Sequence, residues 1–268
     1  MLIPRPSPAQ RGHSTLDPWL QAASRVLHLT ATALAGAMSV STYNRATREV
    51  VQKQIYFTAW QILPGFAAFV ALLSVVIIQI VGETARDFGL YAYALEIVIR
   101  VLVLEILPLT TALFVALRSG AAINTEVALM KIHNELEALE LSGVDPVKFE
   151  LIPRVVGGTI SVLALTAVSI VISLVLAHLL IVDFRPWSLP PGDFTRVIGK
   201  VFDIPSMLIL WCKTLAFGLA VTVIPIAAGL VTPKRLSYAP IAVLRGMVRL
   251  FFALMLVEIG ALAIAYVR

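Results

Sequence analysis

Five long apolar runs, separated by polar segments, dominate the chain from residue 56 onward. A helix needs about 20 apolar residues to cross the hydrocarbon core of a bilayer, and each run is long enough. Within lipid the backbone amides must find partners inside the same segment, which favours helices over strands. The pattern predicts an all-α integral membrane protein with spanning helices at residues 56–81, 90–117, 151–182, 205–231 and 240–267.

The chain before the first run has a different pattern. Residues 1–15 are polar and rich in proline, whereas residues 17–38 carry apolar side chains at helical spacing, interrupted by polar ones. Such a stretch is too polar to span and is typical of an amphipathic helix lying at the membrane interface. We expect residues 1–55 to form a tail and an interfacial helix, joined by a polar linker at 41–54 to a five-span domain of residues 56–268.

Composition supports a membrane protein and indicates its orientation. The chain is 59% hydrophobic and 14% charged, with a mean hydropathy of +0.91, whereas soluble domains are about 45–50% apolar and about 25% charged. The net charge of +5 does not indicate nucleic-acid binding, because the basic residues flank the spans and form no single patch. They concentrate on the side of the N-terminus, which predicts a cytoplasmic N-terminus and a C-terminus on the outer side.

Several features limit the chemistry that the chain can perform. The single cysteine, Cys212, excludes an intrachain disulfide. The four histidines lack the spacing of a metal site. No Gly-x-x-x-x-Gly-Lys-Ser/Thr loop for nucleotide phosphates occurs. We expect a chain that is not an enzyme, holds no metal or cofactor, and depends on a separate ATPase for any ATP-driven role.

Three ionisable residues fall well within the predicted spans: Glu105, Lys213 and Glu258. A charge inside the membrane costs about 2.5–3.5 kcal/mol on insertion scales, so it usually faces the bundle interior or water. Lys213 is the basic candidate at this depth, and we expect it to contact at least one of the two acids. The cluster either lines a transport path or gate, or forms a buried ion pair that fixes helix packing.

The polar segment 118–154, between the second and third spans, has the pattern of an amphipathic helix. Asn124 can cap its start, and apolar residues recur on one face as far as Leu139. Gly143 suits the left-handed position that ends a helix, and Pro146 follows shortly after. A helix of this kind, predicted at 124–141, either lies on the membrane surface or docks in a groove of a partner protein.

The same region carries a family resemblance. The tract begins with Glu105-Ile-Leu-Pro108 and Arg118-Ser-Gly120, and continues through Thr125-Glu126, Leu129-Met130, Glu135-Leu-Glu-Ala-Leu139, Gly143-Val-Asp-Pro146 and Pro153-Arg154. About 50 residues in this order and separation resemble the MlaE permease family. Beyond them the similarity is one of span number and length, together with an acidic residue, a lysine and an acidic residue at the positions of Glu105, Lys213 and Glu258.

The resemblance implies a function and partners. Members of that family are permease subunits of ABC transporters that move phospholipids or other hydrophobic molecules between bacterial membranes. It implies a homodimer in the bacterial inner membrane, a cytoplasmic ATPase that binds ATP and magnesium, and a periplasmic MCE-domain protein. Helix 124–141 becomes the coupling helix on the ATPase. The residues assigned to this coupling are Glu126, Met130, Glu135, Glu137, Asp145, Pro146 and Arg154.

Two other function classes compete with the permease. An ion-coupled secondary transporter could use Glu105, Lys213 and Glu258 as a proton relay, and it would work without a partner. That reading leaves the cytoplasmic amphipathic helix without a role. An enzyme acting on lipid head groups would need a nucleophile with its base, or a metal site, and the sequence offers neither pattern.

Overall fold

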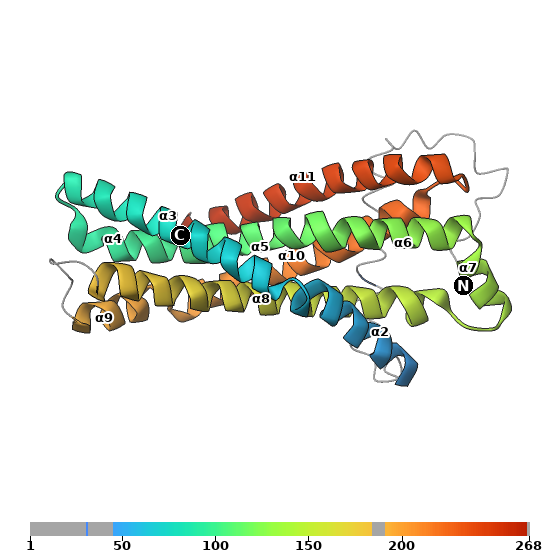
Figure 1. Cartoon of the computed structure of the whole chain (residues 1–268), viewed down its shortest axis with the longest axis horizontal. Helices are drawn as coiled ribbons and strands as arrows, with labels where there is room; N and C mark the ends of the chain where they lie inside the picture. Colours follow the sequence, from blue (N-terminus) through green and yellow to red (C-terminus); the bar gives the residue numbers. More distant parts are fainter. Residues whose placement is uncertain (1–30, 32–44, 184–190, 267–268) are drawn as a thin grey trace.

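The computed structural model describes residue 31 and residues 45–183 and 191–266. Within these residues the chain is helical throughout and has no strand. The α-helices are α2 (Arg45–Ile55), α3 (Leu63–Asp87), α4 (Tyr91–Ile97), α5 (Leu107–Val115), α6 (Ala121–Ile132), α7 (Glu135–Leu141), α8 (Ile152–His178), α9 (Pro191–Val201), α10 (Ile204–Val231) and α11 (Ala239–Tyr266). They form an elongated bundle with α7 at one end and α4 and α9 at the other (Figure 1).

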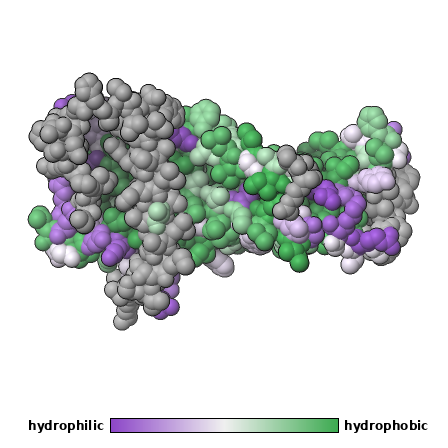
Figure 2. All heavy atoms as spheres, turned by 180° about the vertical axis from the view of Figure 1, so that it is seen from behind, coloured by the Kyte–Doolittle hydropathy of each residue, from purple (hydrophilic) through white to green (hydrophobic). Residues whose placement is uncertain are grey.

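In the described part of the chain, five helical stretches are long and apolar enough to cross a membrane: Thr47–Asp87, Tyr93–Ile132, Val147–Ile181, Ile204–Val231 and Leu236–Ala265. The predicted all-α fold with five spans is therefore confirmed. Within these stretches the helices contain π-helical turns. The turns lie at Tyr56–Trp60, Val98–Ile106, Ala116–Gly120, Val147–Leu151 and Leu179–Asp183. Figure 2 shows hydrophobic residues over the middle of the bundle and hydrophilic residues toward its ends, as expected for a protein surrounded by lipid.

The polar segment predicted at 41–54 is helical over the part that the structure describes. Helix α2 covers that part and continues into the first span. No proline or glycine interrupts it, and Gly157 of α8 lets it approach closely, since a Cβ on Gly157 would lie 2.9 Å from Cβ of Gln54. The interfacial helix predicted at 17–38 lies outside the described residues, except for residue 31.

The single coupling helix predicted at 124–141 is also wrong, because two helices occupy this segment. Helix α6 continues from the second span and ends at Ile132, and α7 starts at Glu135. Between them Asn134 takes a left-handed conformation with φ of 60°, which asparagine tolerates better than most residues. Asn124 therefore lies within α6 and caps no helix.

The predicted helix end at Gly143 is confirmed. Gly143 has φ of 79°, a conformation that glycine adopts at no steric cost. Its amide donates to the carbonyl of Glu140 at 2.9 Å, and the amide of Val144 donates to that of Leu139 at 3.0 Å. These two bonds form a Schellman motif, which stops α7 and turns the chain toward α8.

At the opposite end of the bundle the predicted boundaries change in two places. The turn expected at 82–89 is shorter, since α3 continues to Asp87 and the turn forms around Gly89, with φ of 71°. Helix α9 was not predicted. The fourth span starts as expected: Asp203 caps α10 by accepting a bond from the amide of Ser206 at 3.0 Å, and Pro205 occupies the first turn.

Helix α10 is the centre of the bundle and contacts α6, α8 and α11. Its most apolar window is 61% buried, compared with 17% for the last span. Glycines allow its close approach to α8: a Cβ on Gly158 would lie 2.4 Å from Cγ2 of Thr222, and one on Gly218 would lie 2.9 Å from Cγ2 of Thr159. These two glycines bring the backbones of α8 and α10 close together.

Candidate functional site

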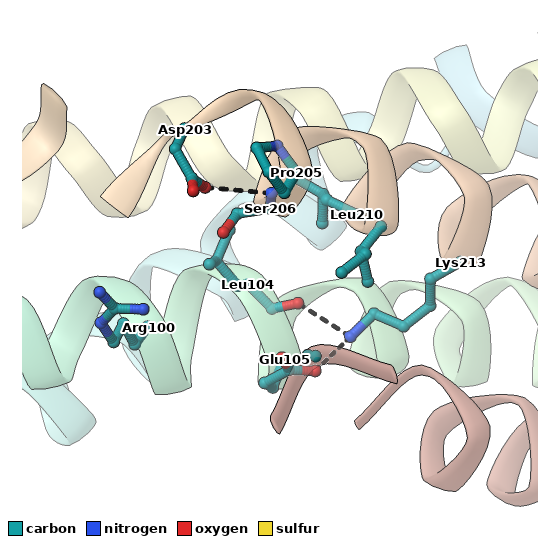
Figure 3. A pocket seen from close by; sticks show the side chains of 10 residues that line it. Arg100, Leu104, Glu105, Asp203, Pro205, Ser206, Leu210 and Lys213 are labelled. Atoms are coloured by element: carbon teal, nitrogen blue, oxygen red, sulfur yellow. Dashed lines mark hydrogen bonds and ion pairs between the residues drawn. The ribbon is translucent and has the colours of Figure 1, made fainter. Parts of the chain in front are cut away.

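The three charged residues of the spans meet in one cluster. The ammonium nitrogen of Lys213 forms an ion pair with Oε2 of Glu105 and lies 3.4 Å from Oε2 of Glu258. Figure 3 shows Lys213 reaching from α10 toward Glu105 and the backbone of Leu104. The lysine side chain is 1% exposed, and the two carboxylates are 17% and 10% exposed. The predicted contact is confirmed, whereas its role in transport stays a prediction.

The local sequence of the second span explains which of its groups bind the ammonium group of Lys213. Glu105 lies in the π-helical turn Val98–Ile106, and Pro108 follows in the first turn of α5. Proline has no amide hydrogen, so the carbonyl of Leu104 lacks its usual α-helical donor. Lys213 donates to that carbonyl at 2.9 Å. π-Helical turns often occur at functional sites, and here the turn presents a carboxylate and a carbonyl to one ammonium group.

The cluster has more acceptors than donors. With all three groups ionised it carries one net negative charge. Nζ of Lys213 donates to Oε1 of Glu258 at 3.4 Å. The buried Oε2 lies at the same distance from Nζ but has no hydrogen bond within the part of the chain that the structure describes. A buried polar atom without a partner is costly and needs an explanation. This oxygen can accept a proton, or a hydrogen bond from a hydroxyl or ammonium group that enters the site.

A pocket of about 290 Å³ lies beside Lys213 and Glu105. Its lining residues are Arg100, Leu104, Glu105, Asp203, Pro205, Ser206, Ile209, Leu210, Lys213 and Ala265. This volume is at the lower limit of small-molecule sites, which are typically about 300–1,000 Å³. Figure 3 shows Arg100 and Asp203 on opposite sides of the pocket, away from Lys213. The pocket therefore joins the cluster to the end of the bundle where α9 lies.

Ion pairs fix the end of the bundle next to this pocket. Nε of Arg100 lies 3.1 Å from Oε1 of Glu96, and Nζ of Lys200 lies 2.8 Å from the other oxygen of that carboxylate. These bonds tie α9 to α4. The hydroxyl and amide of Ser206 donate to Asp203 and hold the pKa of that carboxyl below its usual value. Asp203 thus stays charged at the rim of the pocket.

The residues predicted for ATPase coupling lie at the α7 end but do not form one site. Arg154, at the start of α8, gathers three groups: Nη1 lies 3.0 Å from Glu150 and 3.5 Å from the sulfur of Met130, and Nη2 lies 3.6 Å from Glu126. Sequence reasoning missed Glu150, although the spacing of four residues to Arg154 is typical of helical ion pairs. Arg154 therefore links α6 to α8.

The other predicted coupling residues belong to α7 and the loop after it. Glu137 forms an ion pair at 2.6 Å with Lys234, which also donates to Oδ1 of Asn134. Glu135 lies beside His133. Lys234 was not identified from the sequence, because it follows α10 and only the fold brings it to α7. The remaining two act locally, since Asp145 accepts a bond from the amide of residue 147 and Pro146 is buried after it.

Together, five spanning helices with a buried charge cluster and an adjoining pocket define the chain as a multi-pass membrane protein with a polar site at membrane depth. The model of the family described as Permease MlaE matches residues 51–264. The chain belongs to the MlaE permease family, which confirms the resemblance predicted from the sequence.

Individual relatives are more distant. The chain is 32% identical over 147 residues to the intermembrane phospholipid transport system permease protein MlaE of Haemophilus influenzae, covering 53% of this chain and 54% of the relative. It is 26% identical over 128 residues to a probable ABC transporter permease protein of Synechocystis, covering 48% of each. A probable ABC transporter permease protein of Pyropia yezoensis is 25% identical over 221 residues, or 80% of each chain. The chain thus spans about half the length of the first two relatives.

Proposed function

We propose that this chain is the permease subunit of an ABC transporter that moves phospholipid or another hydrophobic molecule between the inner membrane and the periplasmic side. The observation that carries the proposal is the buried cluster of Glu105, Lys213 and Glu258 beside a pocket of head-group size. Family membership supports it, as does the name of the Haemophilus relative, an intermembrane phospholipid transport system permease.

The cluster offers a lipid head group exchangeable partners. A phosphate that enters the pocket can pair with Lys213 and replace one of its carboxylates. A hydroxyl or ammonium group can donate to the unpartnered oxygen of Glu258. Because the site is shielded from water, each such exchange changes the interaction energy more than it would at the surface. Binding of the head group would thereby weaken the ion pairs that hold three helices together. The helices could then separate and admit the cargo.

Energy for transport would reach this site through α7. The helix is acidic, and Leu141 at its end is 90% exposed, a pattern suited to docking in a groove of a cytoplasmic ATPase. Lys234 connects Glu137 of α7 to the segment between α10 and α11, while Arg154 connects α6 to α8. ATP and magnesium would be bound by that ATPase, and its movement would be passed to the helices that carry the charge cluster.

The same proposal includes two more partners and a location. The last span is the least buried of the five and exposes Phe251, Phe252 and Leu256, which supports contact with a second copy of the chain or with membrane lipid. A periplasmic MCE-domain protein would receive or deliver the lipid. The protein would lie in the bacterial inner membrane with a cytoplasmic N-terminus and a periplasmic C-terminus, as the distribution of basic residues indicates.

Reconstitution tests the proposal. The transporter, purified with the ATPase that accompanies it, is placed in proteoliposomes that contain a fluorescent phospholipid, and lipid movement is followed with ATP or with a non-hydrolysable analogue. We expect movement to require hydrolysis. Movement that is driven by a proton gradient and is indifferent to ATP would contradict the proposal, and it would favour the ion-coupled transporter that the same three charged residues could serve.

A further inference from the structure

Asn124 is a buried polar residue that belongs to neither the charge cluster nor the pocket beside it. It lies in α6, where this helix contacts α10 and α11, and it is fully buried. Its amide nitrogen donates to the carbonyl of Ala242 at a long 3.4 Å. Its side-chain oxygen has no hydrogen-bond partner among the described residues. A joint needed for packing alone would be better filled by an apolar side chain, since an unpartnered buried oxygen costs stability.

Two glycines leave the space that Asn124 occupies. A Cβ on Gly246 of α11 would lie 2.3 Å from Nδ2 of Asn124, and one on Gly229 of α10 would lie 2.9 Å from its backbone oxygen. No side chain fits at either position without movement of a neighbour. We call Asn124, Gly229 and Gly246 the Asn124 junction. It holds α6 directly against the backbones of two spans.

The junction joins the same three helices as the charge cluster. Asn124 belongs to the continuous helical stretch that contains Glu105, Gly229 shares α10 with Lys213, and Gly246 shares α11 with Glu258. At 1.5 Å per residue the two sites are roughly 20–30 Å apart along these helices. Because the same three helices meet at both points, a change in their packing at one point is expected to alter their packing at the other.

The structure also provides a place where α10 can bend and a reason why the junction can change. Pro225 lies inside α10, one turn before Gly229, and a proline removes a helical hydrogen bond and favours a bend there. The amide of Asn124 has one weak bond and one free acceptor, so a small shift of α10 or α11 offers it different backbone partners. Packed joints of this kind tend to switch between discrete arrangements.

We propose that Asn124 is a positioning residue for transport. Movement of α6 pivots at the Asn124 junction, and this pivoting separates the charged side chains of the cluster or brings them together. The inference rests on the proposed function, because it assumes that force from an ATPase enters at the α6–α7 end. It adds a residue outside the cluster whose amide, and not only its volume, is required for coupling ATP hydrolysis to lipid movement.

Four variants test this inference in the transporter purified with its ATPase. Asn124→Leu keeps the branched shape with a larger side chain and removes the amide, Asn124→Ser keeps a small polar group, and Gly246→Ala intrudes on the amide from α11. Gly260→Ala is the matched control in the same helix, since no described residue lies within 4 Å of a Cβ there. ATP hydrolysis and phospholipid movement are measured separately in proteoliposomes, together with the amount of assembled protein.

We expect Asn124→Leu and Gly246→Ala to keep their ATP hydrolysis and to lose about tenfold in lipid moved per ATP, within the range of coupling changes caused by mutations between linked sites. Asn124→Ser should lose less, and Gly260→Ala should match wild type. Equal transport per ATP in all variants, or a parallel loss of assembly, hydrolysis and transport, would overturn the inference and leave the proposed function intact. A wild-type transporter that moves no lipid with ATP would overturn both.

Discussion

The charge cluster at membrane depth and the ion pairs at the α7 end use the same residue types under opposite conditions. Lys213 is 1% exposed and shared by two carboxylates, whereas Lys234 is 46% exposed and faces a half-exposed Glu137. Exposed pairs contribute about 0–1 kcal/mol because water competes for both partners. Removing one partner of a buried pair costs about 3–5 kcal/mol. The buried cluster therefore contributes much more to the stability of the fold than the exposed pairs at the α7 end, whose loss would cost little stability.

The largest effect is expected at the cluster. Lys213→Met strands two buried carboxylates and should lower the free energy of unfolding by about 3–5 kcal/mol. The double variant Lys213→Met/Glu105→Gln removes one of these charges and should recover a large part of the loss. Thermal unfolding in detergent and the amount of inserted protein measure both, with Lys148→Met, at an exposed position, as the control. Additive losses in the double variant would contradict a coupled cluster.

A smaller loss of stability is expected at the seam between the two regions. Gly158→Ala would place a Cβ 2.4 Å from Cγ2 of Thr222, and Thr222 is fixed by its bond to the carbonyl of Gly218. Such overpacking costs about 1–3 kcal/mol. Gly65→Ala is the control, since its Cβ would meet no atom within 4 Å among the residues of the structure, and it should be neutral or slightly stabilising. Equal unfolding temperatures for the two variants would refute the close contact of α8 and α10.

At the α7 end we expect function to change more than stability. Lys234→Ala removes an exposed pair and should cost at most about 1 kcal/mol in stability, while weakening the link from Glu137 to the segment after α10. ATP hydrolysis should then continue with less lipid moved per ATP. The charge exchange Lys234→Glu/Glu137→Lys should restore part of the coupling, and Lys148→Ala should leave it unchanged. A loss that the exchange fails to relieve would argue against this ion pair as the link.

The smallest effect is expected at the rim of the pocket. The bonds from Ser206 lower the pKa of Asp203 in the folded protein. A carboxyl with a lowered folded pKa stabilises the protein above its unfolded pKa and loses this contribution as the pH falls through the folded value. Asp203→Ala should therefore unfold at a lower temperature than wild type near neutral pH, and the difference should shrink below about pH 4. Asp87→Ala, at another exposed position, is the control and should leave the unfolding temperature near that of wild type at neutral pH.

The sequence was most informative where the energetic requirement was strongest. Apolar length defined the five spans, and the cost of three intramembrane charges predicted their meeting without any tertiary information. Gly143 was readable because few other residues adopt its conformation at a helix end. The acceptor role of the Leu104 carbonyl also had a local signal, namely a proline four residues later, although we did not predict it.

Other features depend on contacts that the sequence does not display. His133 and Asn134 are compatible with a continuous helix, and α6 and α7 separate where Lys234, a hundred residues later, bonds to Asn134. Asn124 has the residue type of a helix cap, but the second span continues through it, so it becomes a buried residue of the junction with α10 and α11. Helix α9 is polar on one side and is positioned by the Lys200–Glu96 pair, a contact between distant segments.

Transport by a stable variant without the cluster's charges tests most directly whether these charges take part in moving lipid. Lys213→Met/Glu105→Gln/Glu258→Gln leaves no buried ion pair to break, so it should assemble and hydrolyse ATP. Phospholipid movement per ATP is then compared with that of wild type in proteoliposomes. We predict a loss of at least about tenfold, because the cargo path would have lost its polar partners. Wild-type transport per ATP in this variant would contradict a role of the cluster in the cargo path. It would show that Glu105, Lys213 and Glu258 only pack helices.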